Sequence, residues 1–526
     1  MVLFSKLVLR QTNAEAASTF GAWMGTVYLF SLGGAFLSDS YLGRYLTCVI
    51  FQVVYIIGLV TLSFSTQFLL IKPHGCGITE KLCDHRGQSE FAIFYVSVYL
   101  IALGNGAPEP ALATFGADQF DEEDAKEKQS KSSFYSYFYV ALNLGSLVSE
   151  TVVVYINHVG NWVLGFWLCA GSAVVAFVLL LCGTLRYRHF KTSSGNPFSR
   201  FCQVIVASFR KMHLELPSNT EGLYEDHEIE DENCGMRKIV HTNDFKFLDR
   251  AAIITFAENS EEIKDRWWLC SITQVEEVKC ILRLLPIWMC TLLTSGIFIQ
   301  MLSLFVEQGA AMDTTVSSFQ VPPASLTAFD IVSTSAFILL YDKLILPLYV
   351  KVMKREPRTQ SELERIGIGL IIAILAMICA GFVEQYRLKH AGIKGEEASS
   401  LNILWQIPQY ILLGVSEAFV YVAQMEFFAS QSPDRLKSLG IGLSMSSFAI
   451  GTYLCSLILT IVTAVTSREG KLGWVPPNLN EGHLDRFFFL SAALTMFDLG
   501  LFIVCAKRYK SISFDNGNKN DEVELS

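Results

Sequence analysis

The sequence predicts an all-α membrane protein built from two helical halves. Of its 526 residues, 51% are hydrophobic and 17% are charged, well below the roughly 25% charged content of soluble domains. The apolar residues gather in runs long enough to cross a bilayer, which takes about 20 residues per helix. Because backbone groups in lipid must hydrogen-bond within their own segment, these runs are predicted to be helices.

Eleven full spans are predicted, five before and six after a long polar segment. They run approximately over 18–38, 46–70, 91–115, 134–156, 162–184, 278–306, 323–350, 366–386, 403–428, 438–465 and 484–506. Residues 1–9 resemble the tail of one further helix, so the expected layout is six plus six, with the first helix truncated in this chain. Two six-helix halves with a substrate site near the midplane are the layout of major-facilitator transporters, although other twelve-span carriers share the count.

The expected division of the chain follows the spans. Residues 1–184 form the N-terminal helical half, 185–277 a cytosolic central loop, 278–507 the C-terminal six-helix half and 508–526 a cytosolic acidic tail. The sidedness comes from basic residues such as Arg44, Lys351 and Lys507, which mark the same ends of successive spans. Cytosolic loops carry an excess of lysine and arginine, so those ends are predicted to face the cytosol.

Two loop features follow from this topology. Cys76 and Cys83 lie in a polar loop that faces outward, and in an oxidising space they can form a disulfide. Within the central loop, residues 198–211 are amphipathic and basic, and we expect a helix that lies on the inner membrane surface.

Several classes of function are excluded by what the sequence lacks. The net charge is −9 and no basic run suggests a nucleic-acid partner. There is no P-loop, no H-E-x-x-H motif and no nucleophile elbow, so we expect neither an enzyme nor a bound cofactor or metal. The expected partners are the lipid bilayer and a small-molecule or ion substrate, with a homo- or hetero-oligomer left open.

A glycine-rich turn joins the first two full spans. Residues 34–45 read GAFLSDSYLGRY, and the G-x-x-x-x-D-x-x-x-G-R pattern resembles the major-facilitator signature loop. Its glycines allow a tight turn and close helix approach. Asp39 and Arg44 are then expected to pair across the turn and latch neighbouring helices; an ordinary charged turn is the alternative.

Several motifs resemble those of one transporter family. Residues 138–147 (FYVALNLGSL) resemble the F-Y-x-x-x-N-x-G-S signature of proton-coupled oligopeptide transporters. Together with FGADQFD at 115–121, QVEEVK at 274–279 and IPQY at 407–410, they make the chain similar to the plant nitrate transporter 1/peptide transporter family from residue 1 to about 510. The resemblance implies a proton-coupled secondary transporter that moves nitrate or a related small solute across a plant membrane by alternating access. It favours the plasma membrane over the vacuolar membrane.

In that family, three elements couple solute movement to protons. The first, E-x-x-E-R/K on the first helix, is absent from this chain. The second is a lysine in a G-x-G-x-x-K context, and here the segment 104–110 reads GNGAPEP, which puts Glu109 at the lysine position. The third is a glutamate in a G-x-x-E context, present as Glu417. The lysine–glutamate pair that the resemblance implies has become two acids.

Two facing carboxylates within a membrane have definite chemistry. Ionisable side chains there are costly and mark functional sites by default. Because two close carboxylates cannot both ionise cheaply, the pair favours a shared proton, a bound cation or a base supplied from elsewhere. Pro108 and Pro110 are expected to interrupt the helix at Glu109 and to free carbonyl groups. Potassium/proton exchange through Glu109 and Glu417 is therefore the alternative function, and buried structural acids remain the alternative reading of the pair.

Other residues are candidates by position. Tyr421 and Gln424 share a helix face with Glu417. Asn143, Tyr28 and Gln300 are expected to line the cavity. Glu150, Asp330 and Asp498 are further acids within predicted spans, for which a structural role is expected.

Two further positions are interpreted through the resemblance. The histidine associated with nitrate binding in the family falls on Phe298, so nitrate binding by that imidazole is excluded here. Thr47 matches a regulatory threonine that is phosphorylated in the family, with helix capping as the other reading. A last alternative for the whole chain is a non-transporting truncated regulator that assembles with full-length relatives, because loss of one of twelve helices opens the bundle to lipid.

Overall fold

The structure is a computed structural model. It describes residues 4, 8–9, 13–71, 88–120, 125–158, 160–188, 197–214, 223–225, 238–254, 267–316, 319–354, 361–391, 399–433, 436–467, 473–476, 478–511 and 514–515. Within these residues, 11 helical segments are long and apolar enough to cross a membrane. This confirms the predicted spans, and the ends of these membrane-length segments differ from the predicted ends by less than two turns. Cys76 and Cys83 lie outside the described residues, so the disulfide stays a prediction.

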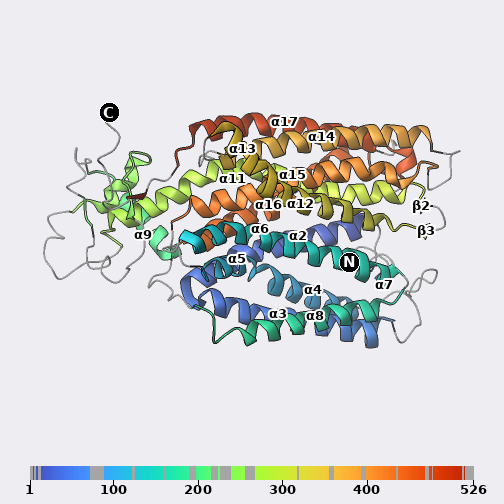
Figure 1. Cartoon of the computed structure of the whole chain (residues 1–526), viewed down its shortest axis with the longest axis horizontal. Helices are drawn as coiled ribbons and strands as arrows, with labels where there is room; N and C mark the ends of the chain where they lie inside the picture. Colours follow the sequence, from blue (N-terminus) through green and yellow to red (C-terminus); the bar gives the residue numbers. More distant parts are fainter. Residues whose placement is uncertain are drawn as a thin grey trace.

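The N-terminal half consists of helices that Figure 1 draws in blue to teal. They are α2 (Asn13–Leu37), α3 (Arg44–Ser65), α4 (Gln88–Gly106), α5 (Glu109–Ala117), α6 (Ala125–Val148), α7 (Val154–His158) and α8 (Trp162–Cys182). π-helical turns extend three of them: Ser38–Leu42 after α2, Thr66–Ile71 after α3 and Ser149–Val153 after α6. The apolar cluster of this half includes Phe4, Val8 and Leu9, and the Phe4 ring stacks on Phe94 at 5.6 Å.

The C-terminal half consists of the helices that Figure 1 draws in yellow-green to red. They are α11 (Ile272–Ala310), α12 (Thr327–Leu340), α13 (Leu346–Met353), α14 (Ser361–Lys389), α15 (Ile407–Ser430), α16 (Lys437–Thr466) and α17 (Leu484–Arg508). Short turns lead into or out of these helices: Pro323–Leu326, Tyr341–Ile345, Ile403–Gln406 and Leu479–Glu481. A hairpin of β2 (Thr315–Val316) and β3 (Phe319–Gln320) follows α11, and it pairs Thr315 with Gln320. We call this end of the bundle the hairpin end.

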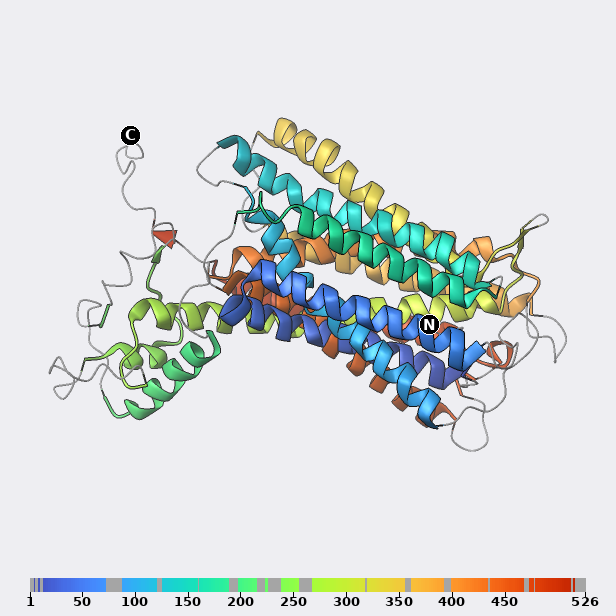
Figure 2. The same cartoon turned by 90° about the horizontal axis from the view of Figure 1, so that it is seen from below.

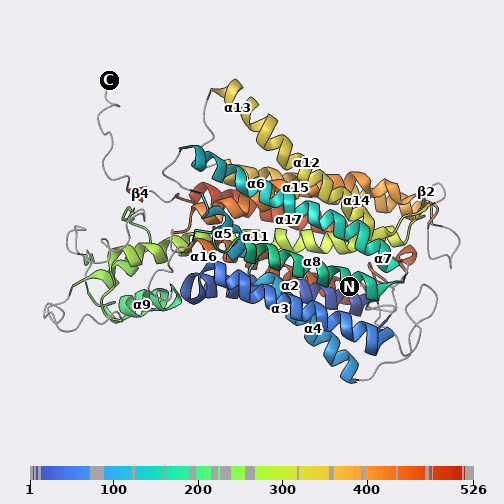
Figure 3. The same cartoon turned by 60° about the horizontal axis from the view of Figure 1, so that its bottom comes forward.

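The two halves meet along two helix pairs. α2 packs along α16, and α6 packs against α12. In the first pair the Tyr28 and Phe448 rings lie 5.3 Å apart, and the Thr26 and Tyr453 hydroxyls are 3.3 Å apart. Figures 1 and 3 show the halves side by side with their long axes aligned. This is the two-half arrangement that the sequence predicted.

The central segment projects beyond the bundle at the end opposite the hairpin, which Figure 2 shows on the left. It contains α9 (Pro197–Arg210), a 3-10 helix over Lys246–Ala252 and β1 (Lys238–Ile239), which pairs antiparallel with β4 (Phe514–Asp515) near the C-terminus. We call this the segment end. It collects Arg44 at the start of α3, the C-terminus of α17 and the start of α11.

The predicted amphipathic helix forms, but its predicted location is wrong. The buried face of α9, with Val204 and Ala207, packs with Leu248, Ala251 and Val278 of the central segment and α11. This face is therefore covered by protein and is not free to lie on a membrane. Periodicity identified an apolar face but could not tell which partner covers it.

A buried ionic cluster fixes the central segment to α11. Lys279 is fully buried, and its Nζ lies 2.6 Å from Asp249 Oδ1 and 2.8 Å from Glu276 Oε1. His241, Asp249 and Glu276 place potential metal ligands within 4.8 Å of one another. The ammonium of Lys279 supplies the positive charge at this cluster, and it also donates to the Thr242 carbonyl at 2.9 Å.

Candidate functional site

The helix that carries Glu109 is interrupted directly before it. α4 ends at Gly106 and α5 begins at Glu109, with Ala107 and Pro108 in a turn between them. Proline at 108 and 110 removes two backbone N–H donors and disfavours a continuous helix. The predicted interruption is confirmed, and it sets Glu109 at the first turn of a new helix.

α2 packs directly onto this break because glycines remove side chains from the contact. A Cβ at Gly34 would overlap the Ala107 carbonyl, and a Cβ at Gly106 would overlap the Val27 carbonyl. Backbones approach this closely only where a small residue allows it. Tyr28, next to Val27, is thereby held near Glu109.

Four of the predicted site residues, which belong to the three helices α2, α5 and α15, interact with one another. Glu109 and Glu417 both interact electrostatically with Tyr28 and with Tyr421. Phe448 of α16 lies between the two tyrosines, 5.3 Å from the Tyr28 ring and 5.4 Å from the Tyr421 ring. Tyr28 and Glu109 come from the N-terminal half, and Glu417 and Tyr421 from the C-terminal half. We call these four residues the central acid site.

Asp330 of α12 belongs to the same site, which sequence analysis missed. Its side chain is 4% exposed and forms a hydrogen bond with the Glu417 side chain. α12 approaches α15 closely at Gly414, where a Cβ would lie 2.5 Å from the Asp330 carbonyl oxygen. The signal available in the sequence was an acid in an apolar run together with a glycine three residues before Glu417.

The remaining predicted liners are placed differently. Asn143 lies in α6, and its side-chain Nδ2 is buried without a hydrogen-bond partner among the described residues. Gln300 lies in α11, but its side chain is outside the described part of the structure. Gln424 is fully buried and binds α16, with its Nε2 donating to Ser447 Oγ at 3.0 Å. Both Asn143 and Gln300 stay predictions as liners.

The signature turn joins three helices at the segment end. Arg44 pairs with Asp118 at the end of α5, and its Nε lies 3.8 Å from Asp39 Oδ1. Asp39 Oδ2 accepts a hydrogen bond from the Leu439 N–H in the first turn of α16, at 3.1 Å. The Asp39–Arg44 contact is thus present, and Asp39 also reaches across to the other half of the protein.

Thr47 is buried in the first turn of α3. Its hydroxyl donates to the Gly43 carbonyl at 2.8 Å, and the side chain has no exposed surface. A kinase could reach this hydroxyl only after the turn opens. Phosphorylation of Thr47 stays a prediction.

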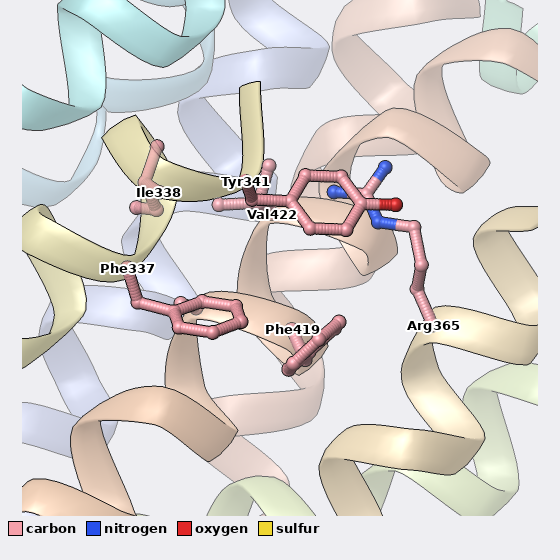
Figure 4. Close-up of a pocket in the computed structure, with 7 residues that line it drawn as sticks. Phe337, Ile338, Tyr341, Arg365, Phe419 and Val422 are labelled. Carbon is pink, nitrogen blue, oxygen red and sulfur yellow. The ribbon is translucent and has the colours of Figure 1, made fainter. Parts of the chain in front are cut away.

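Arg365 is a basic side chain of a described span that is paired with other groups. Figure 4 shows Arg365 of α14 pointing toward the Tyr341 ring in an aromatic pocket with Phe337 and Phe419. Its guanidinium lies 4.9 Å from that ring, and one nitrogen is 2.6 Å from Glu426 Oε2. The charge of Arg365 is therefore compensated by Glu426. Ala418 and Phe419, which directly follow Glu417 in the sequence, also line this pocket.

A second basic residue is buried near the end of a membrane-length helix. α14 extends to Lys389, and Arg387 within it has no exposed surface. Its guanidinium binds both oxygens of Glu384, at 2.7 and 2.9 Å. Because these residues lie at the edge of the apolar run, the pattern could not show that they are buried as a pair.

Comparison with known proteins agrees with this architecture. A family profile described as the POT family matches residues 45–475, which is most of the chain. The chain belongs to the POT family. Two similar POT relatives are the Arabidopsis thaliana proteins named NRT1/PTR FAMILY 7.3 and 7.2, at 52% and 51% identity. The alignments cover 99% and 97% of this chain and 86% and 88% of the relatives.

Solved POT structures have the same fold. An auto-inhibited POT family peptide transporter matches with a TM-score of 0.66 at 20% identity, over 99% of this chain and 96% of that chain. A proton dependent oligopeptide (POT) family transporter matches with a TM-score of 0.55 at 21% identity, over 94% and 91% of the two chains. The predicted family and major-facilitator fold are confirmed, and the chain is a multi-pass integral membrane protein of a transporter family.

Proposed function

We propose that this chain is a proton-coupled secondary transporter that moves nitrate or a related small solute across a plant membrane by alternating access. The observation that carries the proposal is the central acid site, in which Glu109 of one half and Glu417 of the other act on the same two tyrosines. A coupling ion that binds there contacts both halves. The plasma membrane is the location that we infer from the family resemblance.

The coupling follows from charge. Like charges that approach in a low-dielectric interior repel strongly, so the two halves close around Glu109 and Glu417 only when protons or a cation neutralise them. A ligand shifts a conformational equilibrium only by its differential affinity for the two states. Protons that bind more tightly when the carboxyls are close therefore favour the closed central site, and their release favours opening.

Uptake in proteoliposomes tests the coupling. With an imposed pH gradient, isotope-labelled nitrate should accumulate, and Glu417→Gln or Glu109→Gln should reduce that accumulation by about tenfold or more, the effect of roughly 1.4 kcal/mol. Glu127→Gln is the control, because this side chain is 40% exposed and lies near Arg188 at the protein surface. Accumulation that ignores the pH gradient in the unaltered chain would sink the proposal.

Potassium/proton exchange is the second candidate, and the acid at position 109 favours it. Two carboxyls from the two halves beside an interrupted helix offer oxygen ligands, which suit a hard monovalent cation better than an anion. Glu109→Lys would put a positive charge at this position. Loss of rubidium flux with nitrate flux retained would support exchange; unchanged rubidium flux in this variant would count against it.

A further inference from the structure

We propose that Asp330, Tyr410 and Glu150 form a proton relay that connects Glu417 with the hairpin end of the bundle. The relay rests on the proposed proton coupling, and it adds a route by which protons reach the central acid site. Its members come from three elements: Asp330 from α12, Tyr410 from α15 and Glu150 from the π-helical turn after α6.

The inner step of the relay is the hydrogen bond between Asp330 and Glu417. Two carboxyl groups form such a bond only if one of them carries a proton, because two carboxylates are both acceptors. The other oxygen of Asp330, Oδ1, is buried and has no hydrogen-bond partner among the described residues. In the relay, this oxygen therefore exchanges a proton with a further group.

Tyr410 supplies that group. Its side chain has no exposed surface, and its hydroxyl has no hydrogen-bond partner within the described structure. The hydroxyl is close enough to both Asp330 and Glu150 to interact electrostatically with each of them. An unsatisfied buried hydroxyl costs free energy, so its retention needs a reason. The Phe305 ring, 5.3 Å away and nearly perpendicular, fixes the orientation of the Tyr410 ring.

The outer step depends on contact between the two halves. Glu150 Oε2 lies 3.5 Å from Thr327 Oγ1 at the start of α12. The Thr327 hydroxyl donates to this Glu150 oxygen and also to the Ala324 carbonyl at 2.7 Å. Because Glu150 belongs to the N-terminal half and Asp330 to the C-terminal half, separation of α6 from α12 would interrupt the relay. Proton access to Glu417 is thereby tied to the conformation of the hairpin end.

The transfer conserves atoms and charge. A proton leaves the Glu150 carboxyl for the Tyr410 oxygen, while the Tyr410 hydroxyl releases its own proton to Asp330 Oδ1. Asp330 then passes a proton across its hydrogen bond to Glu417. Glu150 is left as a carboxylate and Glu417 gains the proton; no oxidant or other reactant is needed. The titratable groups that face the relay are Glu109, Tyr28 and Tyr421 beyond Glu417.

Two transport assays distinguish a loss of proton relay from a loss of solute binding. In proteoliposomes that contain the unaltered chain, Asp330→Asn or Tyr410→Phe, isotope-labelled nitrate and rubidium are measured both as accumulation driven by a pH gradient and as solute exchange without a gradient. We expect both variants to lose about tenfold or more of the driven accumulation. We expect Tyr410→Phe, which alters a side chain outside the central acid site, to keep exchange within about twofold of the unaltered chain. Asp498→Asn is the matched control, since Asp498 is also 4% exposed but binds Thr294 in another part of the bundle.

The outcomes distinguish the relay from the proposed function. If the unaltered chain accumulates solute under a pH gradient and Asp330→Asn behaves like Asp498→Asn, the relay is wrong and the coupling stands. An infrared measurement tests the relay without a transported solute. Asp330→Asn and Glu417→Gln should remove the same protonated-carboxyl band, and Asp498→Asn should keep it. Persistence of that band in Asp330→Asn would overturn the shared proton, whatever the transport assays show.

Discussion

At the scale of single residues, the distance between Tyr28 and Glu109 depends on two glycines. Gly34 and Gly106 let the α2 backbone touch the turn between α4 and α5. A side chain at either position must push the two segments apart. The geometry of the central acid site therefore depends on two glycines, which have no functional group in a side chain.

Gly34→Ala is expected to destabilise the protein and to weaken proton coupling. The added methyl group overlaps the Ala107 carbonyl, and overpacking of this kind costs about 1–3 kcal/mol. Gly33→Ala is the matched control, because a Cβ there has nothing within 4 Å. Thermal unfolding in detergent and pH-driven uptake should both change for Gly34→Ala and stay unchanged for Gly33→Ala. Equal melting temperatures for the two variants would contradict the close contact.

The residues of the central acid site were predictable to different degrees. Glu109 and Glu417 were identified because a charged side chain in an apolar run stands out. Asp330 stood out equally, but its contact with Glu417 could not be predicted, because the approach of α12 to α15 is set by packing at Gly414. Tyr410 was noted only as part of the IPQY motif, and no role was predicted for its hydroxyl, since a tyrosine in an apolar run usually packs. Only the three-dimensional structure reveals that its buried hydroxyl interacts electrostatically with two acids.

At the scale of helices, the turn after α2 holds the start of α16. Asp39 lies near Arg44 on its own half and accepts the Leu439 N–H of the other half. The first N–H groups of a helix have no partner within that helix, so an acceptor from elsewhere satisfies one of them. This contact ties the two halves together at the segment end.

Asp39→Ala should loosen the first turn of α16. Loss of a hydrogen bond to a charged acceptor costs about 1.5–3 kcal/mol, so hydrogen exchange over residues 436–442 should quicken by about tenfold or more. Asp39→Asn keeps an oxygen acceptor and should change this exchange much less. Peptides from α17 serve as the internal reference. Unchanged exchange at the start of α16 in Asp39→Ala would show that the contact does not hold the helix.

The helices themselves were the most predictable level of the structure. Each crossing requires a long apolar run, so the spans could be located closely from composition. The amphipathic pattern of α9 was equally clear, but it indicates only that a face is buried and not against what. The Glu384–Arg387 pair could not be predicted either, because burial of charges at a helix end depends on the neighbours that cover them.

At the scale of the whole molecule, the two halves touch along α2–α16 and α6–α12, and each interface has a polar contact at a different end. Asp39 meets α16 at the segment end, and Glu150 meets α12 at the hairpin end. Rocking of the halves must break one of these contacts before the central acid site opens on that side. Which end faces the cytosol therefore decides from which compartment the relay draws protons.

Cysteine labelling decides the sidedness. Basic side chains at the segment end, including Arg44, Arg508 and Lys510, predict that this end is cytosolic. In intact cells, a membrane-impermeant maleimide should label Thr315→Cys, on the exposed edge of β2, above the level of the unaltered chain. Lys510→Cys, at a side chain that is 74% exposed, should be labelled only after the membrane is permeabilised. Burial raises the pKa of the nearby Cys270 thiol to about 11, so this native cysteine adds little background near neutral pH. The reverse pattern of labelling would invert the topology, and protons would then enter the relay from the cytosol instead of from outside.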